Sequence, residues 1–136
     1  MTPAENLSGR MPSAADIDAI ARHTLMRLPS PFAESLRDVV LVIEELADDA
    51  TVHRLGLDHP MNLSGLYEGI PLNHRSVDQS GTLPERITLY RRPILAEWHS
   101  SRVSLHQLIA HIVIHEVGHH FGFSDEDMHA LEREAE

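Results

Sequence analysis

Residues 115–125, near the end of the printed sequence, read HEVGHHFGFSD. They contain the pattern H-E-x-x-H, in which His115 and His119 are four positions apart. Because each helical residue advances about 100° around the axis, two histidines at this spacing lie on one face, one turn apart. Two imidazoles placed in this way can share a Zn²⁺ ion at roughly 2.0–2.1 Å, with Glu116 beside them. The stretch therefore predicts a helix that binds zinc and holds a glutamate within reach of a water molecule.

A catalytic zinc site needs a third protein ligand and one open position for water. Gly122 stands where a helix C-terminal glycine would, so the chain can turn back and bring Asp125 near the two histidines. We expect Asp125 to be the third ligand. Two alternatives stay open. In the first, Asp125 is not a ligand and only stabilises the N-terminus of the next helix through the helix dipole. In the second, His129, one turn into that helix, returns to the site.

The chain contains 11 histidines, and we expect most of them to be surface or core residues. His111 lies on the same helical stripe as His115 but about 12 Å along the axis from His119, so one ion cannot readily bind both ends. We interpret His111 as a residue that packs or supports a ligand. His120 is rotated about 100° from His119 and is expected to face elsewhere. His74 is expected to be exposed.

Capping signals place the motif at the end of an amphipathic helix. Ser104 and Gln107 have capping-box spacing, and apolar residues follow at helical intervals into the motif. The same spacing at residues 13–16 and 124–127 predicts the starts of two more helices.

Three segments have strand patterns. Residues 39–43 are a continuous aliphatic run, typical of a buried central strand. Residues 66–70 resemble a second strand, and residues 86–91 alternate in polarity, which favours an edge or near-edge strand. Short helices are predicted at 48–55 and 94–99. Together these elements indicate an α+β fold, in which a small mixed sheet is packed with helices and one helix contains H-E-x-x-H.

Length and composition fit one domain with a single core, since 42% of the 136 residues are hydrophobic and 24% are charged. We expect residues 1–12 to form a flexible arm and residues 13–136 to form the domain. The net charge of −10 argues against nucleic acid, and no window approaches the roughly 20 apolar residues of a membrane span. Because there is no cysteine and no signal-peptide pattern, we expect a cytoplasmic protein whose metal is held by histidine and carboxylate.

The pattern H-E-x-x-H-x-x-G-x-x-D in residues 115–125 resembles a variant of the zincin metallopeptidase motif. With L-Y-E-G-I-P-L at 66–72 and L-P-E-R-I-T-L-Y-R-R-P-I at 83–94, the chain looks like one family of small bacterial zincin-like proteins. That family is described as predicted zinc metallopeptidases with a minimal zincin-like fold. The resemblance covers about residues 15–132.

The resemblance implies His115 and His119 as zinc ligands and Glu116 as the general base. Larger zincins of the gluzincin type take their third ligand from a glutamate on a later helix. Only 17 residues (136 − 119) follow His119 in the sequence, so we do not expect that arrangement here. Metzincins usually have a histidine where Asp125 stands.

These features predict a zinc-dependent metallopeptidase in which Glu116 takes a proton from zinc-activated water and passes it to the leaving amine. An extended peptide or protein substrate is expected to pair with the strand at 86–91. Tyr90, Tyr67 and His129 are alternative donors to the oxyanion. The alternative function is a non-catalytic binding module that holds a structural metal. The presence of Glu116 favours catalysis, because a purely structural site does not need it.

Overall fold

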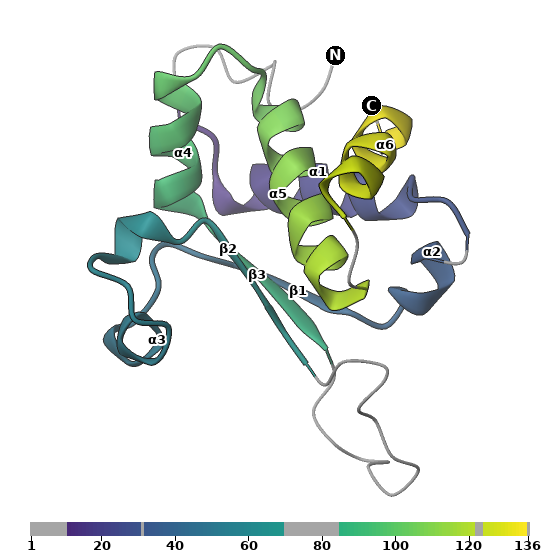
Figure 1. Cartoon of the computed structure of the whole chain (residues 1–136). Coiled ribbons are helices and arrows are strands. Elements are labelled where there is room, and N and C mark those ends of the chain that lie inside the picture. The colour runs from purple at the N-terminus through teal and green to yellow at the C-terminus, as the bar shows by residue number, and fades with distance from the viewer. Residues whose placement is uncertain (1–10, 31, 70–84, 122–123, 136) are drawn as a thin grey trace, which may run out of the picture.

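The computed structural model describes residues 11–30, 32–69, 85–121 and 124–135 (Figure 1). The elements are, in chain order, α1 (Ala14–Met26), α2 (Phe32–Ser35), β1 (Val40–Glu44), α3 (Asp49–Arg54), the 3-10 helix η1 (Pro60–Asn62), β2 (Gly65–Glu68), β3 (Arg86–Tyr90), α4 (Arg91–Ser100), α5 (Leu105–Phe121) and α6 (Asp125–Ala135). No helix in these ranges is long and apolar enough to cross a bilayer.

Three strands form a mixed sheet in the order β1-β3-β2. β1 is parallel to β3, and β2 is antiparallel to it. β3 is therefore the central strand, next to both edges, and the edge alternative in the prediction for residues 86–91 is wrong. Ile87 and Leu89 belong to the core, while Thr88 and Tyr90 on the opposite face are also buried. The alternation in polarity arose because Thr and Tyr have polar groups, although both side chains are covered.

β1 lies at the edge of this sheet, so the prediction of a central strand at residues 39–43 is also wrong. Val40 is 39% exposed, whereas Leu41 is buried and Ile43 packs partly against the core. α1 contacts β1 and covers it. An aliphatic run can therefore be an edge strand when a helix lies over one of its faces.

The helices α1, α5 and α6 gather on one side of the sheet (Figure 1). α5 contacts α1, α6 and β2, so it links the sheet to the last helix. A single cluster of buried side chains joins these elements, with Ile17 of α1, Leu89 of β3 and Ile109 of α5 among its fully buried members. The predicted α+β fold, with a small mixed sheet packed by helices, is confirmed.

The three predicted capping boxes are confirmed. In each box, the serine Oγ accepts a hydrogen bond from the backbone N–H of the partner, and the partner side chain accepts one from the serine N–H. The pairs are Ser13 with Asp16, Ser104 with Gln107 and Ser124 with Asp127.

The two short helices predicted at 48–55 and 94–99 are α3 and α4. α4 is longer than expected, because it begins at Arg91 directly after β3. At the beginning of the described chain, Pro12 is buried and its carbonyl accepts a 2.8 Å hydrogen bond from Arg91 Nε. The predictions for residues 1–10, His74 and Gly122 lie outside the described residues.

Candidate metal and catalytic site

The helix α5 contains the whole H-E-x-x-H pattern, as the sequence predicts. Val113 and Val117 are fully buried on its inner side and fix its orientation against the core. The His115 side chain is 27% exposed, and His119, one turn further, is exposed. The two histidines of the motif therefore lie on the outer side of a helix whose inner side is packed in the core.

Glu116 contacts the edge strand β2. Its Oε2 accepts a 3.2 Å hydrogen bond from the backbone N–H of Tyr67. Strand and helix come close at Gly65, where an added Cβ would lie 2.9 Å from Ile112 Cγ2 and 3.5 Å from Glu116 Cγ. Burial raises the pKa of Glu116, while the charge of His119 and the hydrogen bond from Tyr67 act in the opposite direction.

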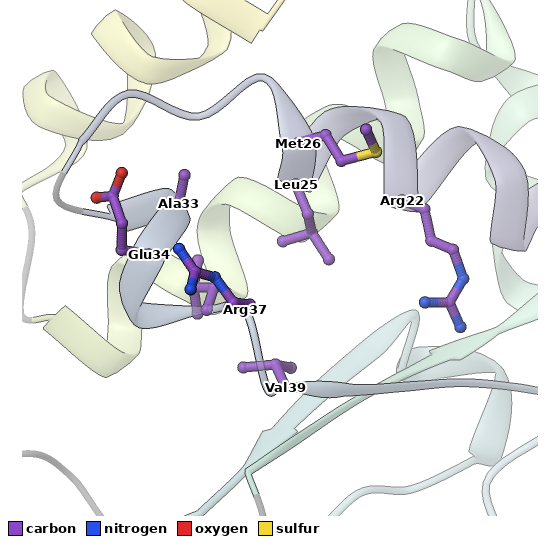
Figure 2. Close-up of a pocket in the computed structure, with 8 residues that line it drawn as sticks. Arg22, Leu25, Met26, Ala33, Glu34, Arg37 and Val39 are labelled. Atoms are coloured by element: carbon purple, nitrogen blue, oxygen red, sulfur yellow. The ribbon is translucent and has the colours of Figure 1, made fainter.

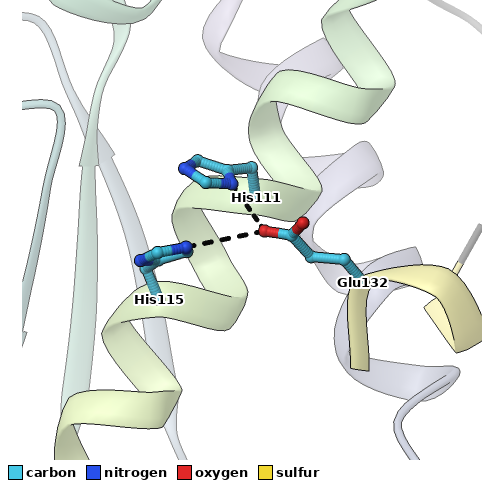
Figure 3. A group of neighbouring side chains, drawn as sticks. All are labelled: His111, His115 and Glu132. Carbon is cyan, nitrogen blue, oxygen red and sulfur yellow. Dashed lines mark hydrogen bonds and ion pairs between the residues drawn. The ribbon is translucent and has the colours of Figure 1, made fainter. Parts of the chain in front are cut away.

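His111 and His115 face a glutamate from α6 (Figure 3). His111 Nδ1 is 2.5 Å from Glu132 Oε1, and His115 Nε2 is 3.6 Å from the same oxygen. The centroids of the two imidazole rings are 4.0 Å apart. One potential ligand atom from each of these residues lies within 4.8 Å of the others. Two helices thus bring two nitrogen ligands and one carboxylate together.

His115 Nε2 is buried and has no hydrogen-bond partner among the described residues. Burial lowers the pKa of His115, and His111 lowers it further, while Glu132 opposes both effects. A neutral imidazole with a buried, unpartnered nitrogen is suited to bind a metal ion. With histidines and carboxylates around it, the chemistry of the donors fits zinc.

His119 and Asp125 are exposed and do not belong to the group formed by His111, His115 and Glu132 in the described chain. Their charges nevertheless act on His115: His119 lowers its pKa and Asp125 raises it. His119 is one helical turn from His115 on α5. Asp125 is also the first residue of α6, where a negative charge favours the helix N-terminus.

The proximity of Glu132 was missed at the level of sequence. The expectation that no glutamate of a later helix supplies the third ligand stays a prediction, but Glu132 of α6 does reach the motif, with Oε1 3.6 Å from His115 Nε2. Met128 and Leu131 are buried against the core, and Glu132 borders this apolar stripe of α6. This apolar stripe was the signal in the sequence that α6 packs against the core and brings Glu132 with it. The interpretation of His111 as a residue that packs or supports a ligand agrees with its contacts to His115 and Glu132.

The three alternative oxyanion donors, Tyr90, Tyr67 and His129, differ in how they are placed relative to the motif. Tyr90 is buried, and burial raises its pKa. The charges of Glu44 and Glu68 raise it further, and neither of these residues lies on α5 or α6. Tyr67 is nearer, through its backbone bond to Glu116. His129 is exposed on α6.

A separate cavity of about 410 Å³ lies between α1, α2 and the start of β1 (Figure 2). Arg22, Leu25, Met26 and Arg37 are among the residues that line it, and none of its lining residues lies on α5 or α6. The cavity is therefore not part of the candidate metal site.

Comparison with known proteins identifies the family of the chain. A family model described as zincin-like metallopeptidase matches residues 36–135, which run from before β1 to the end of α6. A comparison with curated proteins finds no match. The family match covers 100 of the 136 residues (135 − 36 + 1) and includes the α5 motif and the strand beside it. The chain belongs to the zincin-like metallopeptidase family.

Proposed function

We propose that this protein is a zinc-dependent peptidase in which His115, His119 and Asp125 hold the metal and Glu116 is the general base. The main support is the position of Glu116, which is half-buried beside a histidine with an unpartnered nitrogen and is tied to the edge of the sheet. When bound, zinc supplies Lewis-acid polarisation of a carbonyl and activation of water near neutral pH.

The residues of the chain itself perform the proton transfer in this proposal. Glu116 takes a proton from the attacking water and donates it to the leaving amine. The backbone N–H of Tyr67 holds the Glu116 carboxylate beside β2. Burial raises the pKa of Glu116 towards the range that suits a general base.

The substrate that we propose is an extended peptide lying along β2. The expectation that the substrate pairs with the strand at residues 86–91 is wrong, because β1 and β2 occupy both sides of that strand, β3. β2 is an edge strand, and its Tyr67 N–H points away from β3 towards Glu116. A peptide that adds to this edge would bring its backbone beside the carboxylate.

The decisive experiment is cleavage of a peptide library by the wild type, Glu116→Gln and Glu97→Gln. Glu97 is exposed on α4, so its substitution is a matched control. We expect Glu116→Gln to lower the cleavage rate at least about 100-fold, since it removes general-base catalysis. We expect Glu97→Gln to cleave like the wild type. Equal cleavage by all three proteins would exclude Glu116 as the base.

Metal dependence is tested with a chelator and zinc. Cleavage should stop after metal removal and return with stoichiometric zinc, and Asp125→Ala should lower cleavage. Unchanged cleavage by Asp125→Ala would remove this ligand from the proposal but leave Glu116 in place. If the wild type binds zinc and cleaves no peptide, the chain is a non-catalytic binding module instead.

A further inference from the structure

Glu132 and His111 form a cluster with His115 outside the H-E-x-x-H pattern. His111 and His115 are one helical turn apart on α5, and Glu132 reaches them from α6 (Figure 3). All three point towards one another, with Glu132 Oε1 between the two imidazoles at 2.5 Å from His111 Nδ1 and 3.6 Å from His115 Nε2.

These distances are close to those of a metal site. Four ligands at roughly 2.0–2.1 Å around a tetrahedral zinc lie about 3.4 Å from one another. The 3.6 Å separation between His115 and Glu132 already fits this value. The short contact between His111 and Glu132 would have to open by about 1 Å, and the ligand atoms of His111 and His115 already lie within 4.8 Å of each other. The His111 side chain has room for this movement, because it is 49% exposed, whereas the Glu132 side chain is only 21% exposed.

A simpler role for the cluster is a hydrogen bond that joins α5 to α6. That role explains His111 and Glu132, because one ring nitrogen bonds the carboxylate. It leaves out His115, whose buried Nε2 lies 3.6 Å from the same oxygen and has no hydrogen-bond partner in the described ranges, and which the set proposed for catalysis would also use. A cation between the three residues would satisfy that nitrogen.

We propose that His111, His115 and Glu132 form a second divalent-cation site, with zinc as the preferred ion. Two imidazole nitrogens and one carboxylate are a common zinc ligand set that leaves one position open. The site has one residue, His115, in common with the set proposed for catalysis. Because one ring nitrogen binds one ion, the two sets compete for His115. This competition, unlike the site itself, rests on the proposed function.

The test uses a background in which the other set is disabled, His119→Ala with Asp125→Ala. Zinc binding is measured by calorimetry, and the ligand environment by the visible absorption of bound cobalt. Glu132→Gln and His111→Gln are each added to this background. Glu126→Gln and His53→Gln, at exposed positions on α6 and α3, are the matched controls. Thermal unfolding in chelator checks that every protein is folded.

We expect the background protein to bind about one zinc per chain. Glu132→Gln and His111→Gln should each weaken binding at least tenfold, and the controls should not. The proposal is overturned if the background protein binds no zinc, or if Glu132→Gln binds as tightly as Glu126→Gln. Should His111→Gln fail to fold, the comparison of the two glutamine variants on α6 still decides. Peptide cleavage is not measured here, so failure of the second site and failure of the peptidase proposal give different results.

Discussion

At the scale of single residues, the position of Glu116 depends on how closely β2 approaches α5. Gly65 is buried at this approach, and no larger side chain fits without movement. The contact at issue involves Ile112 Cγ2, which would lie 2.9 Å from an added Cβ. Because Ile112 is itself part of the packed core, the strand has to move away from the helix if this space is filled.

We predict that Gly65→Ala lowers the free energy of unfolding by about 1–3 kcal/mol, as overpacking of a filled core does. Urea unfolding followed by circular dichroism measures this change. Ser64→Ala is the control, because it alters the neighbouring side chain without adding an atom to the contact, and it should change stability by less than about 0.5 kcal/mol. Equal stability of Gly65→Ala and the wild type would mean that β2 and α5 are not in tight contact.

At the scale of elements, short helices depend on their caps. α3 has six residues and no buried side chain, so few tertiary contacts support it. Asp48 caps it by accepting a 2.8 Å hydrogen bond from the Thr51 N–H, and Gly56, with φ of 68°, follows its end. Bonds from the Thr51 side chain and backbone lower the pKa of Asp48. The ionised carboxylate is therefore the form that holds the helix start.

This shift gives a pH dependence with a definite sign. Because the folded-state pKa of Asp48 is lowered, its stabilising effect is present above the unfolded value near 3.8 and is lost as the pH falls through the folded pKa. We predict that hydrogen exchange at the Thr51 amide accelerates, relative to its intrinsic rate, on acidification of the wild type. Asp48→Asn keeps a capping oxygen that does not titrate, so it should lack this response. The same acceleration in both proteins would show that the cap does not cause it.

At the scale of the whole molecule, one core cluster joins α1, the sheet, α5 and α6. Trp98 of α4 is the single tryptophan, and it packs against this cluster. A domain of this size with one core is expected to unfold in one cooperative step. Tryptophan fluorescence and backbone circular dichroism should therefore report the same event.

We predict that the midpoints of unfolding by the two signals coincide. Ile109→Ala, at a fully buried position of α5, should lower both midpoints together and cost about 2–5 kcal/mol. A fluorescence transition that precedes the loss of helix signal would contradict this prediction, because it would mean that α4 separates from the core before the rest unfolds.

Local signals in the sequence were enough for the longer helices α1, α5 and α6 and for the fold class, but not for α2 and η1. The H-E-x-x-H helix, the three capping boxes and the segments that form strands were all predicted, because their periodicity and caps involve residues only a few positions apart. The family resemblance is confirmed by the match over residues 36–135. The assignments of His115, His119, Asp125 and Glu116 stay predictions for the experiments above.

The order of the strands and the approach of Glu132 to α5 could not be predicted from such local signals. β3 lies in the centre because it pairs with β1 and β2, which come from distant parts of the chain, and its Thr88 and Tyr90 are buried there. Glu132 meets His111 because α6 folds back along α5 through Met128 and Leu131. Both arrangements depend on contacts between residues far apart in sequence, for which a pattern of neighbouring residues has no signal. H-E-x-x-H was therefore evident from the chain alone, while its neighbours Tyr67 and Glu132 were identified by packing.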